Sequence, residues 1–338
     1  MNIIPEILLN KKNLIKILST DRYDELLFEK AKETSLSVFG NKIYVRGLIE
    51  FTNYCKNGCY YCGINKENTK AERYRLSLDE ILQCCRQGNR LGFKTFVLQG
   101  GEDGYFSNAR MVEIIRAIKK EFPNHALTLS IGERSFEAYK SFYDAGADRY
   151  LLRHETCTLE HYNKLHPENM SLFNRLNCLK NLKNIGFQTG CGIMIGSPYQ
   201  TIQNIADDIL YMYDFDPQMI GLGPFIPHKD TIFRDMPKGS VEMTLRVLAI
   251  MRILLPNVLL PATTALGTLD KKGREKGILA GANVLMPNLS PLKDRKKYSL
   301  YDNKICTGEE AAESLEKLKN RIAKIGYEIV SDRGDYKN

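Results

Sequence analysis

The sequence lacks an uninterrupted apolar run long enough to cross a bilayer. The most apolar stretch, residues 247–260, is broken by Arg252, Pro256 and Asn257. The N-terminus, MNIIPEILLNKK, also lacks the charged region, apolar region and small-residue cleavage site of a secretory signal peptide. These absences argue against a membrane-spanning or secreted protein. We therefore expect a cytoplasmic protein with no membrane partner.

The sequence also lacks a strong excess of either charge. It has 48 basic and 40 acidic residues, spread along the chain, for a net charge of +8. The only dense basic run is KDRKK at 293–297, which we interpret as a solvated loop rather than a nucleic-acid patch. We expect no nucleic-acid partner, while a basic pocket for an anionic substrate stays possible.

A glycine repeat is the strongest indication of the fold. Five times a helical pattern ends in Gly and passes directly into a strand-like run, at Gly92, Gly146, Gly186, Gly281 and Gly326. Gly just past a helix adopts the left-handed conformation that ends it. Helix, Gly, strand and loop in sequence make a βα unit, whose strands must be parallel.

The strands that we expect occupy 43–51, 95–99, 127–130, 149–153, 188–193, 219–223, 260–264 and 284–286. Eight strands with helices between them predict an α/β fold, a closed (β/α)8 barrel of the TIM type. A doubly wound open sheet is the alternative. Residues 326–330 would form a ninth strand outside the barrel.

No Pro- or Ser-rich linker divides the chain, so we predict one domain over residues 1–338. Residues 1–42 have apolar positions at helical spacing and would form an N-terminal helical cap. Residues 43–290 would form the barrel, and 291–338 a C-terminal extension with a helix and a strand.

Three cysteines are clustered directly after the first expected strand. Cys55, Cys59 and Cys62 have the spacing C-x3-C-x2-C, with Tyr61 before the last one. Three thiolates leave one iron of a four-iron cubane without a protein ligand, free to bind a small molecule. A structural zinc site wants four ligands, and no fourth Cys or His lies near. The motif resembles the signature of radical S-adenosylmethionine (SAM) enzymes, in which the open iron binds the amino and carboxylate groups of SAM.

Further polar or unusual residues follow the expected strands, where barrel enzymes carry their chemistry. Adjacent Gly100 and Gly101 let backbone approach a ligand, and Glu102 can accept hydrogen bonds from its ammonium group. Arg153 offers a planar fork to a carboxylate, and Glu155 can accept hydrogen bonds from ribose hydroxyls. The alternatives are an ordinary glycine turn at Gly100 and Gly101, and a structural ion pair or simple packing at Arg153 and Glu155.

Other candidates have equally plain alternatives. Arg175 could bind the SAM carboxylate or lie on the surface. Met194 could face adenine or belong to the core. Thr263 and Thr264 could bind a substrate anion or bond to their own backbone. Tyr298 and Tyr301 could cover the barrel mouth or be packing residues.

The sequence is identified as resembling the FeFe-hydrogenase maturases of the HydE family. The resemblance covers about residues 43–306 and includes the following segments: IEFTNYCKNGCYYCGINKEN, RYRLSLDEI, LQGGED, AGADRYLLRHET, NRLNCLKNLKNIGFQTG, GLGPFIPH, LPATTALGT and GANVLMPNLSP. GPFIPH, PATTA and MPN distinguish this branch from biotin synthase and methylornithine synthase.

The resemblance implies one 4Fe-4S cluster and reductive cleavage of SAM to a 5′-deoxyadenosyl radical. It implies cluster ligands Cys55, Cys59 and Cys62. It implies SAM contacts from Tyr61, Gly100, Gly101, Glu102, Ser130, Glu155, Arg175 and Met194. It implies a substrate cavity with Gln99, Arg153, Thr263, Thr264, Met286, Tyr298 and Tyr301.

The resemblance also implies a substrate and partners. Family members are thought to act on an iron–cysteine precursor carrying CO and cyanide, supplied by a second radical SAM maturase. Their product feeds diiron cofactor assembly on a scaffold GTPase. The reductant would be a ferredoxin or flavodoxin.

Two departures from the family pattern stand out. Some relatives hold an auxiliary cluster with three cysteines near the C-terminus. Here Cys306 matches the first, but no cysteine follows it, so we expect no second cluster. Many relatives also carry Ser where this chain has Gly100.

Two other functions remain open at the level of sequence. One is a radical SAM enzyme of small-molecule metabolism, similar to methylornithine synthase or biotin synthase, acting on a free organic substrate. The other is a non-catalytic cluster carrier, which would have little need for a SAM pocket.

Overall fold

The structure is a computed structural model that describes residues 4–305 and 312–337. Its helices are α1 (Pro5–Leu9), α2 (Lys11–Leu18), α3 (Asp24–Phe39), α4 (Leu78–Arg90), α5 (Asn108–Glu121), α6 (Phe136–Asp144), α7 (Leu159–Leu165), α8 (Leu172–Ile185), α9 (Ile202–Phe215), α10 (Val241–Leu254), α11 (Thr264–Leu269), α12 (Gly273–Leu279), α13 (Leu292–Arg295) and α14 (Leu315–Ala323). Its strands are β1 (Lys42–Val45), β2 (Gly47–Thr52), β3 (Thr95–Gly100), β4 (Ala126–Ser130), β5 (Arg149–Leu151), β6 (Gln188–Ile195), β7 (Met219–Pro224), β8 (Val284–Leu285) and β9 (Glu328–Val330).

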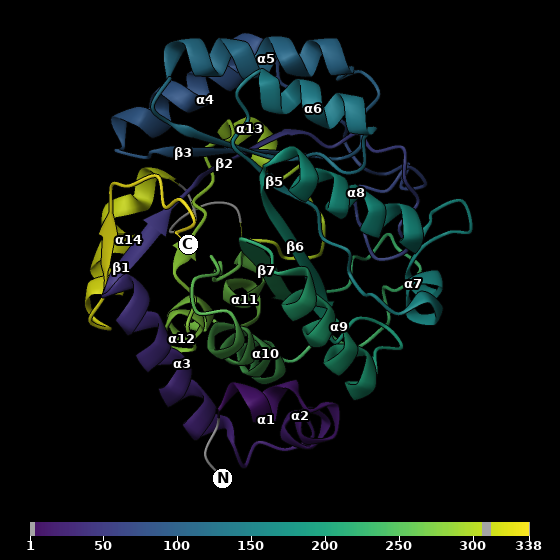
Figure 1. The fold of residues 1–338 in the computed structure, drawn as a ribbon. Coiled ribbons are helices and arrows are strands. Elements are labelled where there is room, and N and C mark those ends of the chain that lie inside the picture. The colour runs from purple at the N-terminus through teal and green to yellow at the C-terminus, as the bar shows by residue number, and fades with distance from the viewer. Residues whose placement is uncertain (1–3, 306–311, 338) are drawn as a thin grey trace.

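Parallel strands form the centre of the molecule, with helices outside them (Figure 1). Strands β2 to β7 follow one another in chain order in one parallel sheet, and β8, β1 and β9 form a second. Because β1 leads directly into β2, the two sheets continue into each other. The closed barrel that the sequence predicts is therefore confirmed, and the open doubly wound sheet does not form.

The expected seventh strand, 260–264, is wrong as a strand. Within it only Pro261 makes a bridge, to Val284, and just before it Leu259 makes an isolated parallel bridge to Met219. Pro261 has no N–H and cannot continue a regular ladder. Backbone hydrogen bonds from Leu259 to Gln218 O and from Ala262 to Val284 O still close the barrel here. Thr264 opens α11 instead of ending a strand.

The expected first strand, 43–51, is two strands that separate at Arg46. The Arg46 side chain is buried at the base of the barrel, where its Nη1 lies 3.0 Å from Met219 Sδ. Before Arg46 in the chain, β1 pairs with β8 and β9. After Arg46, β2 pairs with β3. A register shift between Glu50 and Thr52 then bends the end of β2 toward the cysteine loop.

The five glycines that the sequence placed at helix ends all have positive φ, from 83° at Gly92 to 109° at Gly146. This prediction is confirmed, and it explains why short turns suffice between helix and strand.

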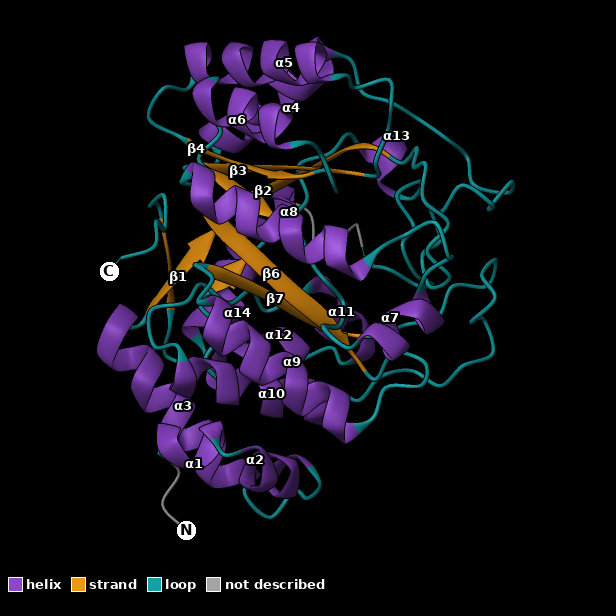
Figure 2. Cartoon of the chain, turned by 45° about the vertical axis from the view of Figure 1, so that its right-hand side comes forward, coloured by secondary structure: helices purple, strands orange, loops and turns teal. Residues whose placement is uncertain are grey.

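The N-terminal helices cover one side of the barrel. α3 packs along α10, and α2 packs along α9, which places α1–α3 together below the barrel helices in Figure 1. In Figure 2 the long loops gather on one side and the C-terminus lies on the other. The loop side is where the strands end, and therefore where the site is expected.

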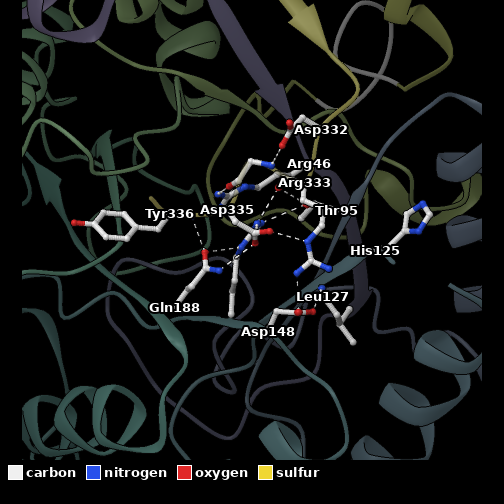
Figure 3. Close-up of polar contacts among 12 residues, drawn as sticks. Arg46, Thr95, His125, Leu127, Asp148, Gln188, Asp332, Arg333, Asp335 and Tyr336 are labelled. Carbon is white, nitrogen blue, oxygen red and sulfur yellow. Dashed lines mark hydrogen bonds and ion pairs between the residues drawn. The ribbon is translucent and has the colours of Figure 1, made fainter. Parts of the chain in front are cut away.

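The C-terminal segment closes the opposite, N-terminal end of the barrel. β9 pairs with β1 and so is part of the sheet, which corrects the expectation of a ninth strand outside the barrel. Residues 331–335 then cross the base (Figure 3). Arg149, fully buried at the start of β5, donates to Asp335 Oδ1 (2.6 Å) and Arg333 O (2.8 Å). Arg333 in turn donates to Asp335 Oδ2 (2.7 Å) and Asp148 Oδ1 (2.9 Å).

The basic run at 293–297 is less solvated than expected. It contains the short helix α13, in which Arg295 is buried and donates to Ser290 O at 2.6 Å. Lys297 pairs with Glu72 and Asp294. The charges of this run are thus largely used within the fold, and they anchor the start of the C-terminal extension. None of the helices in ranges 4–305 and 312–337 has the length and apolar character that crossing a bilayer requires.

The base of the barrel yields a stability prediction. Burial by itself would raise the pKa of Asp335, but the guanidinium groups of Arg333 and Arg149 outweigh it and hold that pKa well below its usual range. We expect Asp335→Asn to lower the free energy of unfolding by about 1–2 kcal/mol at neutral pH, because it leaves buried Arg149 without a charge partner.

This loss has a defined pH dependence. A depressed carboxyl pKa contributes stability that is fully present above the unfolded-state pKa of about 4 and is lost as pH falls from there through the lower folded-state pKa. The difference between wild type and variant should therefore stay constant from about pH 7 to about pH 5 and shrink as pH falls further to about pH 3 in urea unfolding. Asp144→Asn removes an exposed pair with Lys140 and should change stability by less than about 0.5 kcal/mol. A loss in Asp335→Asn no larger than in this control would contradict the prediction.

Candidate active site

A cavity of about 350 Å³ opens at the C-terminal ends of the strands. Among the residues that line it are Tyr61, Cys62, Gln99, Gly100, Ser130, Arg153, Glu155, Arg175, Met194, Thr263, Thr264, Met286, Tyr298 and Tyr301. All of these are residues that the sequence singled out. Cys55, Cys59, Gly101 and Glu102, which the sequence also singled out, are not among the residues that line the cavity.

The cysteine loop is held against the end of β3. Cys55 Sγ accepts a hydrogen bond from Glu102 N at 3.4 Å, and Lys56 N donates to Glu102 O at 3.0 Å. A Cβ on Gly101 would lie 2.2 Å from Tyr54 O and 2.7 Å from Cys55 Cβ. The second glycine of GG therefore lets the cysteine loop pack directly on the strand end.

The last cysteine of the motif faces the cavity. Cys62 N bonds to Cys59 O at 3.2 Å, so the two thiol-bearing residues share a tight turn. The next residue, Gly63, packs against the ring of His228 and the backbone of Ser299, where a Cβ would approach within 2.3 Å of each. His228 is the last residue of GPFIPH, which connects that motif to the cysteine loop.

The three cysteines of the motif carry free thiols of the kind that ligates iron–sulfur clusters. All three are free, and burial raises the pKa of Cys59 to about 12 and that of Cys62 further above its usual range. Such thiols stay neutral until a metal replaces their protons. Over 4–305 and 312–337, no group of three His, Cys, Asp or Glu side chains converges as a site for one metal ion. Thiolates from Cys55, Cys59 and Cys62 are the donors that a 4Fe-4S cluster would take here.

Glu102 is fixed behind the cavity. Its carboxylate accepts from Glu133 N at 2.9 Å and lies 3.3 Å from Lys56 Nζ. A Cβ on Gly132 would lie 2.1 Å from Glu102 Cγ and 2.2 Å from Glu102 Oε1. Gly132 lines the cavity, so its missing side chain leaves Glu102 close to the cavity surface. The sequence analysis did not single out Gly132.

Gly100 is packed too closely for a larger residue without adjustment. A Cβ there would lie 2.8 Å from Thr52 Cγ2 and 3.1 Å from the Phe51 ring. A Ser at this position would therefore require Thr52 to move.

Arg153 and Glu155 form a pair within the cavity wall. Arg153 Nη2 donates to Glu155 Oε2 at 2.9 Å, while Arg153 Nε is buried without a hydrogen-bond partner among the described residues. Burial raises the pKa of Glu155, although Arg153 and Arg175 oppose the rise. Glu155 also has φ of 66°, a left-handed conformation that is uncommon for this residue type. His154, between them, points into the core, where burial lowers its pKa to about 3.

Arg175 is buried, which rules out the surface alternative. It lies in α8, with Nε 2.5 Å from Glu133 Oε1 and Nη1 donating to Arg153 O at 2.9 Å. Glu133 thus orients the guanidinium toward the cavity. Tyr61 is held in a similar way, with its hydroxyl 3.3 Å from His166 Nε2.

The far side of the cavity is lined from α11 and the segment after β8. Thr263 Oγ1 is buried with no hydrogen-bond partner among the described residues, so it is free to bond a ligand. Thr264 and Met286 line the cavity beside it. Tyr298 is fully buried and its hydroxyl accepts from Gln99 Nε2 at 3.4 Å.

Two charged cavity residues were missed by the sequence analysis. Glu50 of β2 and Lys304 both line the cavity and form an ion pair. An acidic residue in the apolar run GLIEF was a signal for an inward-facing carboxylate. Lys304 lies in an irregular segment with no periodic pattern, and nothing in its neighbourhood predicts its position.

The chain is similar to known proteins over most of its length. A family model for the radical SAM superfamily matches residues 49–212. The FeFe hydrogenase maturase subunit HydE of Thermotoga maritima is 42% identical over 315 residues, which cover 93% of this chain and 90% of that protein. This chain belongs to the HydE family.

Solved structures support the same fold for this HydE family member. The crystal structure of methylornithine synthase (PylB) superposes with a TM-score of 0.83 at 25% identity, covering 96% of this chain and 97% of that one. The maturase HydG from Carboxydothermus hydrogenoformans superposes with a TM-score of 0.81 at 20% identity, covering 95% and 75%. The protein is therefore a radical SAM enzyme with a barrel fold, a class that uses a 4Fe-4S cluster and SAM.

A variant of the central cysteine tests the cluster assignment. We expect Cys59→Ala to reduce both the cluster absorption after anaerobic reconstitution and 5′-deoxyadenosine formation under dithionite to background, because a cubane held by two thiolates is not retained. Cys178→Ala, a buried thiol of α8 outside the motif, is the control and should retain both. Retained SAM cleavage in the Cys59 variant would refute the assignment.

A pair of glycine variants tests the packing of the cysteine loop. Gly101→Ala places a methyl group against Tyr54 O and Cys55, whereas a Cβ on Gly104 meets nothing within 4 Å. Overpacking of this kind costs about 1–3 kcal/mol, so iron retained per chain should fall about tenfold in Gly101→Ala. Iron analysis after desalting should show no change in Gly104→Ala. Equal iron in the two variants would contradict the role of Gly101.

Proposed function

We propose that this protein acts in assembly of the FeFe-hydrogenase diiron cofactor, as a HydE-type maturase. Its substrate would be an iron–cysteine complex carrying CO and cyanide, made by a second radical SAM maturase. The observation that carries this proposal is the 42% identity to Thermotoga HydE over nearly the whole of both chains. The other maturases, and a ferredoxin or flavodoxin as reductant, would be its partners in the cytoplasm.

Cys55, Cys59 and Cys62 would hold one 4Fe-4S cluster. Cys62 lines the cavity, so the open corner would face the space in which SAM binds. When bound, the cluster and SAM supply a 5′-deoxyadenosyl radical by reductive cleavage of SAM. We propose no second cluster. Cys306 lies outside the described residues, and no other cysteine follows it in the chain.

The wall nearest the thiols would bind SAM. Tyr61, Gly100, Ser130 and Met194 lie on the surface of this wall, and Gly101 and Glu102 lie behind it. Arg175 is oriented by Glu133 and would bind the SAM carboxylate, since a guanidinium matches a carboxylate in planar geometry. Glu155 would accept hydrogen bonds from the ribose hydroxyls, with Arg153 holding its carboxylate in place.

The opposite wall would bind the substrate. Arg153 Nε and Thr263 Oγ1 are buried polar atoms without a partner in the described part of the chain, and such atoms are costly unless a ligand satisfies them. An anionic complex would supply the acceptors. Gln99, Thr264, Met286, Tyr298 and Tyr301 would complete the surface around it.

A second candidate is a radical SAM enzyme of small-molecule metabolism. The observation that favours it is the close superposition on methylornithine synthase, with nearly complete coverage of both chains. Such an enzyme would bind a free organic substrate in the same cavity and would need no hydrogenase partner. Failure to bind SAM would favour a cluster carrier over both.

The decisive experiment is anaerobic reconstitution with iron, sulfide, SAM and dithionite, with and without the iron–cysteine complex. We expect the complex to be consumed and the rate of 5′-deoxyadenosine formation to rise with its concentration. Lysine, a free amino acid of the kind that the second candidate would use, should have no effect. Turnover of the amino acid with no consumption of the complex would reverse the preference between the two functions.

A further inference from the structure

A segment after the barrel crosses the cavity and contacts the cysteine loop. We call residues 297–304 the strap. Its backbone accepts from Asn53 Nδ2 at Lys297 O (2.7 Å) and from Gly63 N at Leu300 O (2.9 Å). The strap therefore touches the loop on both sides of the three cysteines. Three side chains of the strap, Tyr298, Leu300 and Tyr301, line the cavity.

A second set of contacts ties the strap to the GPFIPH loop. Asp302 N donates to Pro227 O at 3.0 Å, and Lys229 N donates to Asp302 Oδ2 at 2.8 Å. These bonds lie at the protein surface, where water competes for them.

The last residue of the strap enters the cavity. Lys304 Nζ forms an ion pair with Glu50 Oε1, donates to Tyr298 O at 2.9 Å, and lies 4.8 Å from the centre of the Tyr298 ring. Glu50 is 0% exposed and its other oxygen accepts from Asn288 Nδ2 at 2.9 Å. One ammonium group thus joins the second barrel strand to both the backbone and the ring of the cavity tyrosine.

We propose that Lys304 and Glu50 are positioning residues of this radical SAM site, whose ion pair anchors the strap so that Tyr298 and Tyr301 form a fixed wall of the cavity. Neither residue had been given a role by the sequence. The proposal deepens the proposed function, since the same cavity is involved, but it depends only on radical SAM chemistry and not on the identity of the substrate.

A gain in folding stability does not by itself explain why an ion pair is found at this position. Removing two charges from water is expensive, and apolar residues of similar size would close the same contact at equal or lower free energy. An ion pair instead fixes direction, because the charged groups tolerate only a narrow geometry. A primary carbon radical abstracts hydrogen from almost any nearby C–H bond, so the positions of the cavity walls decide which bond it meets. A loosened strap would admit water and allow reaction with the wrong groups.

The first test needs no substrate. Trypsin can cut after Lys296 and Lys297, at the start of the strap, once the strap opens locally. Lys304→Met keeps the length of the side chain and removes its charge, leaving Glu50 unpaired. We expect cleavage at Lys296 and Lys297 to become about tenfold faster in the reconstituted enzyme. Loss of the ion pair raises the fraction of molecules in which the strap is open, and trypsin cleaves only the open form. Lys304→Arg should restore most of the protection.

Two further variants make the test specific. Glu50→Gln removes the partner charge and should accelerate cleavage in the same way as Lys304→Met. Lys276→Met removes a lysine that pairs with Asp270 outside the cavity and should leave cleavage unchanged. Iron content should equal that of wild type in all four variants, which keeps a folding defect distinct from a loosened strap. Unchanged cleavage in both Lys304→Met and Glu50→Gln would overturn the proposal.

The second test measures coupling with the iron–cysteine complex. We expect Lys304→Met to raise the ratio of 5′-deoxyadenosine formed to complex consumed at least about fivefold, with SAM cleavage itself retained, since a misplaced wall misdirects the radical rather than preventing its formation. A wild-type ratio in the variant would overturn the positioning role. If the wild type fails to consume the complex, the proposed substrate is wrong. The proteolysis comparison would still show whether the ion pair anchors the strap.

Discussion

Closure of the barrel is the constraint on which the rest of the structure depends. It is completed by an irregular segment, 258–262, whose backbone bonds to β7 on one side and to β8 on the other. Without these bonds β7 and β8 would be edge strands, and the ring of strands would stay open. Because the strands are parallel and the ring is closed, every loop that follows a strand reaches the same cavity.

The two ends of the barrel use charge for different purposes. At the base, Arg149, Arg333 and Asp335 form a network that seals the strand starts and satisfies a fully buried guanidinium (Figure 3). At the mouth, Arg153, Glu155, Glu50 and Lys304 line an accessible cavity. Paired charges in both places avoid the penalty of an isolated buried ion. At the mouth, Arg153 Nε and Thr263 Oγ1 have no hydrogen-bond partner among the described residues, so they can bond to a ligand.

The sequence predicted the repeating architecture well, because glycines at helix ends and apolar strand runs are local signals. It failed where pairing is decided by distant partners. Arg46 splits the first strand because its neighbours are Met219 and Gly334, and Pro261 interrupts the seventh although its surroundings read as a strand. In the site, residues that directly follow strands were identified from position and resemblance. Lys304 was not, because its role depends on a contact with Glu50 that no local pattern encodes.

The late pairing of β1 has a consequence for synthesis in the cell. Tyr44 pairs with Val284, 240 residues later, and Ile43 with Ile329, 286 residues later, so β1 finds its partners only after most of the chain has been made. At ribosomal rates this interval is roughly ten seconds to a minute. During that time β1 is an unpaired edge on the nascent chain, open to association with other extended segments. Chaperone dependence of the newly made chain would follow from strand order alone.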